Sequence, residues 1–581
     1  MTRRLMTLFS FLIVFTMLFS VGCTAQPTET EAPVEEAETA EEAEEPAEEE
    51  EAAEEPAEEA EEPAEEAEET LVVFRQPANE PDSLDPAQGG FGYQEFASLY
   101  EPLVDSFSSQ EITPLAAESF EFSEDNTVIT FKLREGLKWS DGEPVTAEDY
   151  RLSFLRQIDP ATAAYTPQEF FPIKNAQLFN AGEITDPNEV GITAPDDLTL
   201  VIELEEPSPQ FLSYVGNSNF MPVRVDLIEE YGDKWMEAGN HVGNGPYMLV
   251  EWEHDQRMVF EKNPHYSGIW KDTAHVDRIE FVLMADAWNQ AVPAFEAGEV
   301  DVAIAPTSEL PRLLESDEYA EMVNNVSIAG SVILIMDTAN EPTDDVRVRQ
   351  ALSLAIDRET LAEGALRGAF EPAVSLSPPS LASHNPDEAF GYQYDVELAK
   401  ELLAEAGYPD GEGFPEFEIT YWSVDRAQLV MQALQAMWKQ NLGIEVTLNP
   451  LEPQAMSDWR ISRNEQSYNM QYGLNWAGIA DPSEFHNALF DPNNSLKRSR
   501  YDNQEYIDLM RAALVEGDPD TRAEMYREAE SIINEDVPII SLFYEGQTWL
   551  IQPYVENFQE ITSSVALMFR YAQPPGLMLE Q

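Results

Sequence analysis

Alternation of hydrophobic and polar positions predicts strands in two early parts of the chain. From Phe120 to Trp139 the alternation indicates a β-hairpin, and it is clearest in the run TVITFKLR. Residues 71–75 (LVVFR) are short and almost wholly apolar, as is typical of a buried strand. The chain is therefore expected to contain sheet structure on both sides of residue 100.

Helices are predicted between and after these strands. A short helix is expected over residues 95–104. Thr146 is the predicted N-cap of a second helix, because Asp149 follows three residues later in a near capping-box pattern. Hydrophobic residues at helical spacing over 346–356, opened by two aspartates, predict a third helix.

The segment from Ser467 to Phe490 contains a predicted strand that ends in glycines. Gly473, Gly478 and the Asp481-Pro482 step are expected to break this strand, and Trp476 lies at its tip. Such an end suits a place where another backbone comes close. We expect this segment to form one side of a ligand cleft.

A second glycine-rich stretch follows the strand at 71–75. The run PANEPDSLDPAQGGFGYQ is dense in Pro, Gly and Asp and predicts a loop. Gly89, Gly90 and Gly92 bracket Phe91, and such glycines let another backbone approach closely. They also fit a plain turn, which the sequence alone favours.

Composition excludes one class of partner. The chain has 581 residues, enough for three or four domains, and a net charge of −79. A field of that sign repels phosphate backbones, so nucleic-acid binding is disfavoured. Because the acidic residues are spread along the chain, a solvated surface explains them better than attraction for a cationic ligand.

The first residues have the pattern of an export signal. Two arginines precede an apolar run from Leu5 to Val21, which is slightly short for a membrane-spanning helix. The run ends at Gly22 and Cys23, the one cysteine, and this end resembles a bacterial lipoprotein signal, although Ser20 replaces the usual leucine. We expect a signal peptide over 1–22, an acylated Cys23 and an extracytoplasmic protein anchored to the cell membrane. An ordinary signal is the alternative.

Residues 23–70 are expected to form a disordered acidic linker. This stretch holds 23 glutamates and no lysine, arginine or aspartate. Neighbouring glutamates repel one another, and Pro46, Pro56 and Pro63 each cut a helix short. An extended tether of this length could hold a domain on the order of 100 Å from the membrane.

No catalytic motif stands out. The sequence has no HExxH, GxSxG or GxxxxGK[ST] motif, its six histidines are scattered, and its one cysteine belongs to the signal. We therefore expect neither an enzyme nor a cofactor or metal.

Several long motifs carry a family resemblance. The run TFKLREGLKWSDGEPVTAEDYRLSFLRQIDPATAAYT resembles the family-5 extracellular solute-binding proteins of ABC importers. FEAGEVDVA, TDDVRVRQALSLAIDRETL and the segment from Ser467 follow in the family's order. The resemblance covers essentially all of residues 71–581 and is closest to the oligopeptide-binding branch.

The resemblance implies an α/β fold of the bilobal periplasmic-binding-protein (Venus-flytrap) kind, type II-like, with an additional inserted domain. Lobe I would comprise residues 71–107, 220–305 and 546–581. The inserted domain (lobe II) would be 108–219 and lobe III would be 306–545. A chain that crosses between lobes more than once suits a hinge that closes without swivelling.

The resemblance also implies a monomeric, lipid-anchored receptor. It would capture an extended oligopeptide between two lobes by main-chain hydrogen bonds and deliver it to an ABC permease and ATPase complex. The residues that this implies at the ligand are Gly90, Phe91, Gly92, Tyr93, Leu474, Asn475, Trp476, Ala477, Gly478 and Asp481. Trp476 could also be an ordinary core residue, although the cleft is favoured.

One departure from the resembled family concerns the ligand's amine. An aspartate of oligopeptide binders pairs with the ligand's α-ammonium, and the aligned position here is Gly478. Because a buried ammonium without a partner is costly, either another carboxylate replaces the aspartate or the ligand has no free amine. The candidate carboxylates are Asp481, Glu484, Glu95 and Glu80.

A ligand without an amine opens the alternative of an oligosaccharide or another non-peptide solute. Trp422, Trp438, Trp459 and Trp476 could supply aromatic faces for sugar stacking, although Trp438 is expected to pack its own helix. A sensory receptor or an enzyme that uses the closed cleft is the weaker alternative.

The lipid anchor has a direct test. Cys23→Ser removes the thiol that would be acylated, so the protein should leave the membrane fraction when cells are fractionated. Continued sedimentation of the variant with membranes would instead indicate an uncleaved apolar helix.

Overall fold

The computed structural model describes residues 70–74, 80–89, 93–106, 112–269, 276–283, 287–367, 370–388, 390–452, 455–456, 459, 468–476, 481–483, 485–486, 499–556 and 578–579. The chain divides into two units, Met1–Glu66 and Ala67–Gln581, and every described residue belongs to the second. The predicted signal, Cys23 and the acidic linker up to residue 69 therefore lie outside the described residues.

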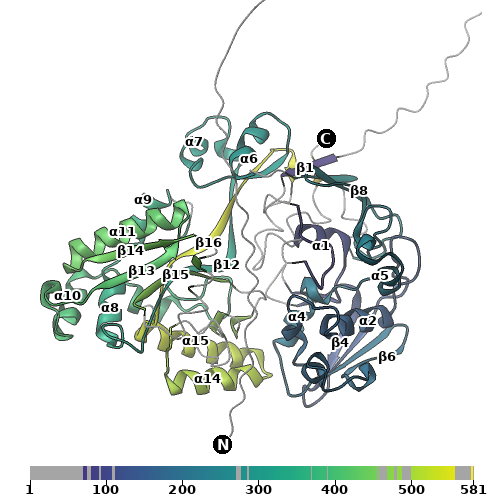
Figure 1. Ribbon diagram of the computed structural model, residues 1–581, viewed down its shortest axis with the longest axis horizontal. Coiled ribbons are helices and arrows are strands. Elements are labelled where there is room, and N and C mark those ends of the chain that lie inside the picture. The colour runs from purple at the N-terminus through teal and green to yellow at the C-terminus, as the bar shows by residue number, and fades with distance from the viewer. Residues whose placement is uncertain are drawn as a thin grey trace, which may run out of the picture. The chain divides into compact units, whose positions relative to one another are not determined.

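Ten strands form one mixed sheet (Figure 1) in the order β14-β13-β15-β12-β16-β11-β1-β10-β9-β8. In that order the strands are Val446–Leu451, Phe417–Trp422, Met470–Trp476, Val323–Met336, Ile539–Ile551, Val302–Ile304, Thr70–Phe74, Arg278–Val282, Arg257–Lys262 and Tyr247–Glu253.

The two long central strands, β12 and β16, join the two halves of this sheet. One part of the pair, Val323 to Ser327 against Gly546 to Leu550, lies on the side of β11 and β1. The other part, from Ser331↔Tyr544 onward, lies on the side of β15 and β13. The register shifts between the two parts, so the sheet has an irregularity where its halves meet.

A separate four-stranded antiparallel sheet has the order β4-β5-β7-β6. Its strands in chain order are β4 (Ala117–Phe122), β5 (Val128–Leu133), β6 (Ile192–Asp196) and β7 (Thr199–Glu203). Short pairs are formed by β2 (Val104–Asp105) with β3 (Thr113–Pro114) and by β17 (Val555–Glu556) with β18 (Met578–Leu579).

Helices accompany both sheets. They are α1 (Tyr93–Leu99), α2 (Ala147–Ile158), α3 (Ala176–Asn180), α4 (Phe211–Val215), α5 (Val225–Tyr231), α6 (Ala287–Glu296), α7 (Leu310–Leu314), α8 (Val346–Leu354), α9 (Arg358–Ala365), α10 (Val396–Glu405), α11 (Asp425–Leu442), α14 (Gln504–Val515) and α15 (Pro519–Asp536). Among the described residues, none of these helices combines the length and the apolar composition that a membrane crossing needs.

Buried hydrophobic residues gather in separate cores that follow this division. The core around the four-stranded sheet draws its buried members from Leu103 to Phe220. A second core packs against β8 to β11, and a third packs against β12 to β16 together with α8 and α11. Further clusters lie around α14 and α15 and around Ala373, and the division into the lobe ranges given above stays a prediction.

Local sequence signals agree with the structure at several points. The hairpin is β4 and β5, with Phe120 opposite Phe131. Thr146 caps α2 in a full capping box, because its backbone N–H donates to Asp149 Oδ2 at 2.7 Å and its hydroxyl accepts from the Asp149 N–H. The third predicted helix is α8, and Asp345 is its N-cap.

Two local predictions are wrong. The helix expected over 95–104 ends at Leu99, since Pro102 disfavours helical geometry in the residue before it. Gly473 does not break the predicted strand but pairs with Ile333 inside β15. The hydrogen bonds to β12 on one side of this strand outweigh the weak strand propensity of glycine.

Candidate functional site

The end of β15 is hydrogen-bonded along one edge only. On one side β15 pairs antiparallel with β12 over its whole length, from Met336↔Met470 to Gly330↔Trp476. On the other side β13 reaches only its first residues, Ile419↔Met470 and Thr420↔Gln471. In the described part of the chain, no strand pairs with the second edge of residues 472–476, and we call this stretch the open edge. Tyr472 and Gly473 are buried, whereas Leu474 and Asn475 are half-buried.

The predicted site residues on β15 lie along this open stretch. Leu474 is half-buried against the core of α8 and α11, and Asn475 is half-buried with its Nδ2 donating to the Phe485 carbonyl at 3.0 Å. Trp476 is the last residue of the strand, opposite Gly330. Ala477 and Gly478 lie outside the described residues.

Asp481 is buried and already paired. Its side chain is 5% exposed, and Arg522 donates to both of its oxygens at 2.6 and 2.8 Å. The Arg522 guanidinium also donates to the Ala513 carbonyl and lies over the Tyr526 ring. Asp481 is thus held in place by α15, and its charge is balanced without any ligand.

A cavity of about 270 Å³ lies beside this pair. Its lining includes Asp481, Arg522 and Tyr526 together with Ser106 and Ser213. Arg522 is paired with Asp481, and Glu516 is a second carboxylate in the lining of this cavity.

The other carboxylates considered for the ligand's amine differ in exposure. Glu95 on α1 is fully buried. Glu80 is partly exposed and contacts the His254 imidazole, whose pKa this contact raises. Glu484 lies outside the described residues. The burial and contacts of these carboxylates do not identify one that would bind the ligand's amine.

The glycine loop of the first lobe is described only at its two ends. Gly90, Phe91 and Gly92 lie outside the described residues, and Tyr93 begins α1. At Gly89 an added Cβ would lie 2.6 Å from Phe96 Cζ and 2.8 Å from the Ser83 carbonyl oxygen. This glycine is therefore required by close packing within the protein itself.

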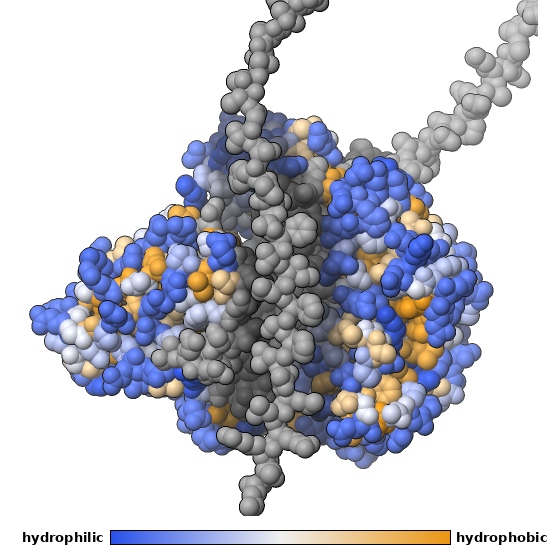
Figure 2. All heavy atoms as spheres, in the orientation of Figure 1, coloured by the Kyte–Doolittle hydropathy of each residue, from blue (hydrophilic) through white to orange (hydrophobic). Residues whose placement is uncertain are grey.

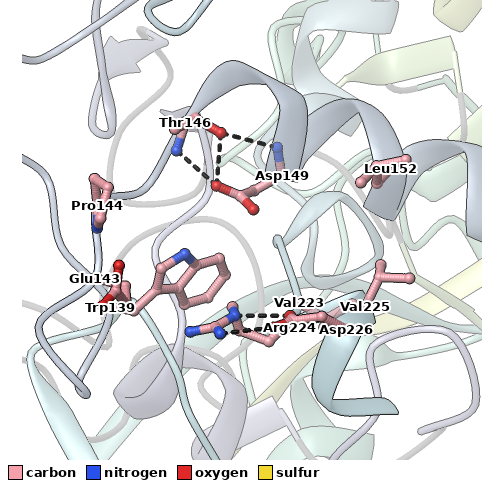
Figure 3. A pocket seen from close by; sticks show the side chains of 10 residues that line it. All are labelled: Trp139, Glu143, Pro144, Thr146, Asp149, Leu152, Val223, Arg224, Val225 and Asp226. Atoms are coloured by element: carbon pink, nitrogen blue, oxygen red, sulfur yellow. Dashed lines mark hydrogen bonds and ion pairs between the residues drawn. The ribbon is translucent and has the colours of Figure 1, made fainter. Parts of the chain in front are cut away.

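None of the predicted ligand residues lines a second cavity, of about 370 Å³, whose lining side chains are drawn in Figure 3. Arg224 lies over the Trp139 ring at 5.9 Å and pairs with Asp141 and Asp226. Burial raises the pKa of Asp149, which also lines this cavity. The charge of Arg224 is thus balanced by the two aspartates.

The tryptophans considered for sugar stacking are mostly engaged. Trp438 is fully buried on α11, and its Nε1 donates to the Leu352 carbonyl at 2.8 Å, which confirms its predicted packing role. Trp422 is half-buried at the end of β13. The Trp459 ring meets Tyr468 edge-on at 5.7 Å.

Glu101 carries a strongly perturbed carboxyl group close to α1. Burial raises its pKa to about 7, against smaller opposing effects of a hydrogen bond from the Tyr266 hydroxyl and of Arg134. Its backbone is fixed by Asn244, which accepts from its N–H at 2.9 Å, and by the Tyr150 hydroxyl. Glu101 therefore connects α1 to α2 while holding a proton near neutral pH.

Two α/β halves joined by two strands, with an open strand edge in one of them, define a solute-binding protein of the periplasmic-binding class. The family described as "bacterial extracellular solute-binding proteins, family 5 Middle" matches this chain over residues 111–497. The chain therefore belongs to this family. The fold is the bilobal, type II-like α/β fold with an additional domain.

Relatives and solved structures agree with this membership. The chain is 30% identical over 501 residues to the dipeptide-binding protein DppE of Bacillus subtilis, covering 84% of this chain and 89% of DppE. It is 31% identical over 498 residues to the probable deoxycholate-binding periplasmic protein YgiS of Escherichia coli, covering 83% and 89%.

Among solved structures, the unliganded open form of the murein tripeptide-binding protein MppA superposes with a TM-score of 0.77. It is 30% identical and covers 88% of this chain and 98% of MppA. All three are named as binding proteins.

The buried carboxyl of Glu101 predicts a pH-dependent stability. Because its folded pKa of about 7 lies above the ordinary 4.5, its contribution is complete below about pH 4.5 and is lost as pH rises through 7. Glu101→Gln should remove this dependence. The difference in the free energy of unfolding between the wild type and the variant should therefore change by on the order of 3 kcal/mol between pH 4.5 and 8.

Chemical denaturation of both proteins across this range measures the effect. Parallel pH profiles of the wild type and the variant would contradict a neutral buried carboxyl.

Proposed function

We propose that this protein is the substrate-binding component of an ABC importer and that its ligand is an extended oligopeptide. The observation that carries the proposal is the open edge of residues 472–476 on β15. A peptide that adds a strand there would pair its main chain with Leu474, Asn475 and Trp476. Relatives named as dipeptide- and murein-tripeptide-binding proteins support the same ligand class.

Main-chain pairing suits a receptor for many sequences. Each backbone hydrogen bond contributes about 0.5–1.5 kcal/mol whatever the side chain. Because β15 is held by β12 along its whole length, its backbone groups are already ordered before a ligand arrives, which lowers the entropic cost of binding. The loop Gly90–Tyr93 would face the peptide from the other lobe.

The hinge of this receptor would lie in β12 and β16. We place lobe I at 71–107, 220–305 and 546–581, the inserted domain at 108–219 and lobe III at 306–545. The register shift between Ser327 and Ser331 then lies beside the crossing at 545/546, because Ser327 is opposite Gly546 and Ser331 is opposite Tyr544. Two adjacent crossings restrict the motion to bending, which is the closure that a peptide clamp needs.

The protein would act as a monomer at the outer side of the cell membrane. Acyl chains on Cys23 would anchor it, and residues 24–70 would let the receptor reach its permease and ATPase complex. Figure 2 shows hydrophilic residues over most of the coloured surface, with hydrophobic ones scattered among them. Such a surface supports the interpretation of the charge of −79 as solvation.

A non-peptide solute is the second candidate. Its support is the 31% identity to a probable deoxycholate-binding protein, together with the glycine at position 478. An apolar or sugar ligand would need no carboxylate for an amine. Of the tryptophans considered for stacking, Trp438 is unavailable because it is buried.

Calorimetry separates these candidates. A pool of tripeptides to pentapeptides is titrated into the full chain, and cello-oligosaccharides and deoxycholate are titrated in parallel. The proposal expects binding from the peptide pool alone. Binding heat from the oligosaccharides or from deoxycholate, with none from the peptides, would contradict the peptide proposal and support a non-peptide solute.

Trp476 provides a residue-level test. Trp476→Ala should weaken peptide binding by about tenfold, the effect of losing about 1.4 kcal/mol of contact at the end of the open edge. The melting temperature should change less than for Trp252→Ala, a half-buried tryptophan on β8 that serves as the control. An unchanged dissociation constant in the folded Trp476 variant would remove this residue from the site.

A further inference from the structure

Asp85 is the centre of a buried anchor just before the glycine loop. It is followed by proline, and its Oδ1 accepts from the Ala87 N–H at 2.9 Å, two residues further on. Arg156, in the last turn of α2, donates one nitrogen to each oxygen of the Asp85 carboxylate. The Asp85 carbonyl then accepts from the N–H of Gly89 at 2.7 Å.

Asp481 forms the same arrangement after the tip of β15. It too is followed by proline, and its Oδ1 accepts from the Ser483 N–H at 2.9 Å, again two residues further on. Arg522, in α15, donates one nitrogen to each carboxylate oxygen. The amide of Asn475 then donates to the Phe485 carbonyl, which joins the strand end to this turn.

Burial makes both pairs rigid. The aspartate side chains are 3% and 5% exposed, and the arginines are 16% and 13% exposed. A planar guanidinium that meets a carboxylate with two parallel hydrogen bonds fixes direction as well as distance. Breaking such a pair leaves an uncompensated buried charge, so neither aspartate turns freely toward another partner.

We propose that Asp85–Arg156 and Asp481–Arg522 are matched positioning pairs and that Asp481 does not receive the ligand's ammonium. The first pair fixes the turn up to Gly89, which precedes the predicted ligand residues, and the second fixes the turn that Asn475 of β15 contacts. This inference rests on the proposed function. Both oxygens of Asp481 are already used by Arg522, and each pair lies next in the chain to a predicted ligand segment.

The two roles of Asp481 predict different specificity. If Asp481 bound the ligand's ammonium, the protein would favour peptides with a free N-terminus. Substitution of Asp481 would then lower the affinity for those peptides alone. A positioning residue acts on the backbone of the site, so its loss weakens free and N-acetylated peptides by the same factor.

The test measures the dissociation constants of one pentapeptide in free and N-acetylated form by calorimetry. Asp481→Asn, Arg522→Gln and Arg156→Gln should each raise both constants by about tenfold or more and leave their ratio unchanged. Arg522→Lys keeps the charge but loses the two-pronged contact, and it should recover part of the affinity.

Arg500→Gln is the matched control. Arg500 donates to the buried carboxylate of Asp337 at 2.6 Å, close to the opposite end of β15, where the Asp337 N–H donates to the Asn469 carbonyl. Its loss should lower the melting temperature as the other arginine variants do, while both dissociation constants stay at the wild-type values.

A selective loss of the free peptide in Asp481→Asn would overturn the inference and make Asp481 the amine receptor. Wild-type affinity in folded Arg522→Gln and Arg156→Gln proteins would also overturn it. If Arg522→Gln does not fold, the near-isosteric Asp481→Asn decides alone. Failure of the wild type to bind either peptide would instead reject the proposed function, which separates the two claims.

Discussion

The pairing of β12 with β16 is the constraint on which the rest of this protein depends. These two strands carry the only hydrogen-bonded connection, among the described strands, between the halves of the ten-stranded sheet. Ladder hydrogen bonds on either side of the register shift keep each half intact, while the shift itself provides a place to bend. Everything proposed about ligand capture requires that these strands hold the halves together without locking them.

Binding by main-chain contacts makes a rigid backbone more important than any single side chain. β12 pairs with one edge of β15, and the pair of Asp481 and Arg522 holds the turn in which Asp481 accepts from the Ser483 N–H. This division of labour explains how an oligopeptide receptor could work without an aspartate at Gly478. Affinity would come from a strand edge that is already ordered before the peptide binds. The buried ion pair would stabilise the protein and would not contact the peptide.

Local signals in the sequence were sufficient for local structure. The capping box at Thr146 and Asp149 and the hairpin around Phe131 depend on neighbours a few residues away. The positioning pairs were not predictable, because Asp85 and Arg156 are 71 residues apart and Asp481 and Arg522 are 41 apart. The burial of Glu101 and the continuation of β15 through Gly473 likewise depend on elements distant in the chain.

The most direct test is a distance between the lobes, measured with spin labels. Tyr165, in the proposed inserted domain, and Tyr394, in the proposed lobe III, are 73% and 51% exposed, so both can be replaced by labelled cysteines. Closure on a peptide predicts a shorter and narrower distance distribution by pulsed electron resonance when a binding peptide saturates the protein. The same distribution with and without bound peptide would contradict the account.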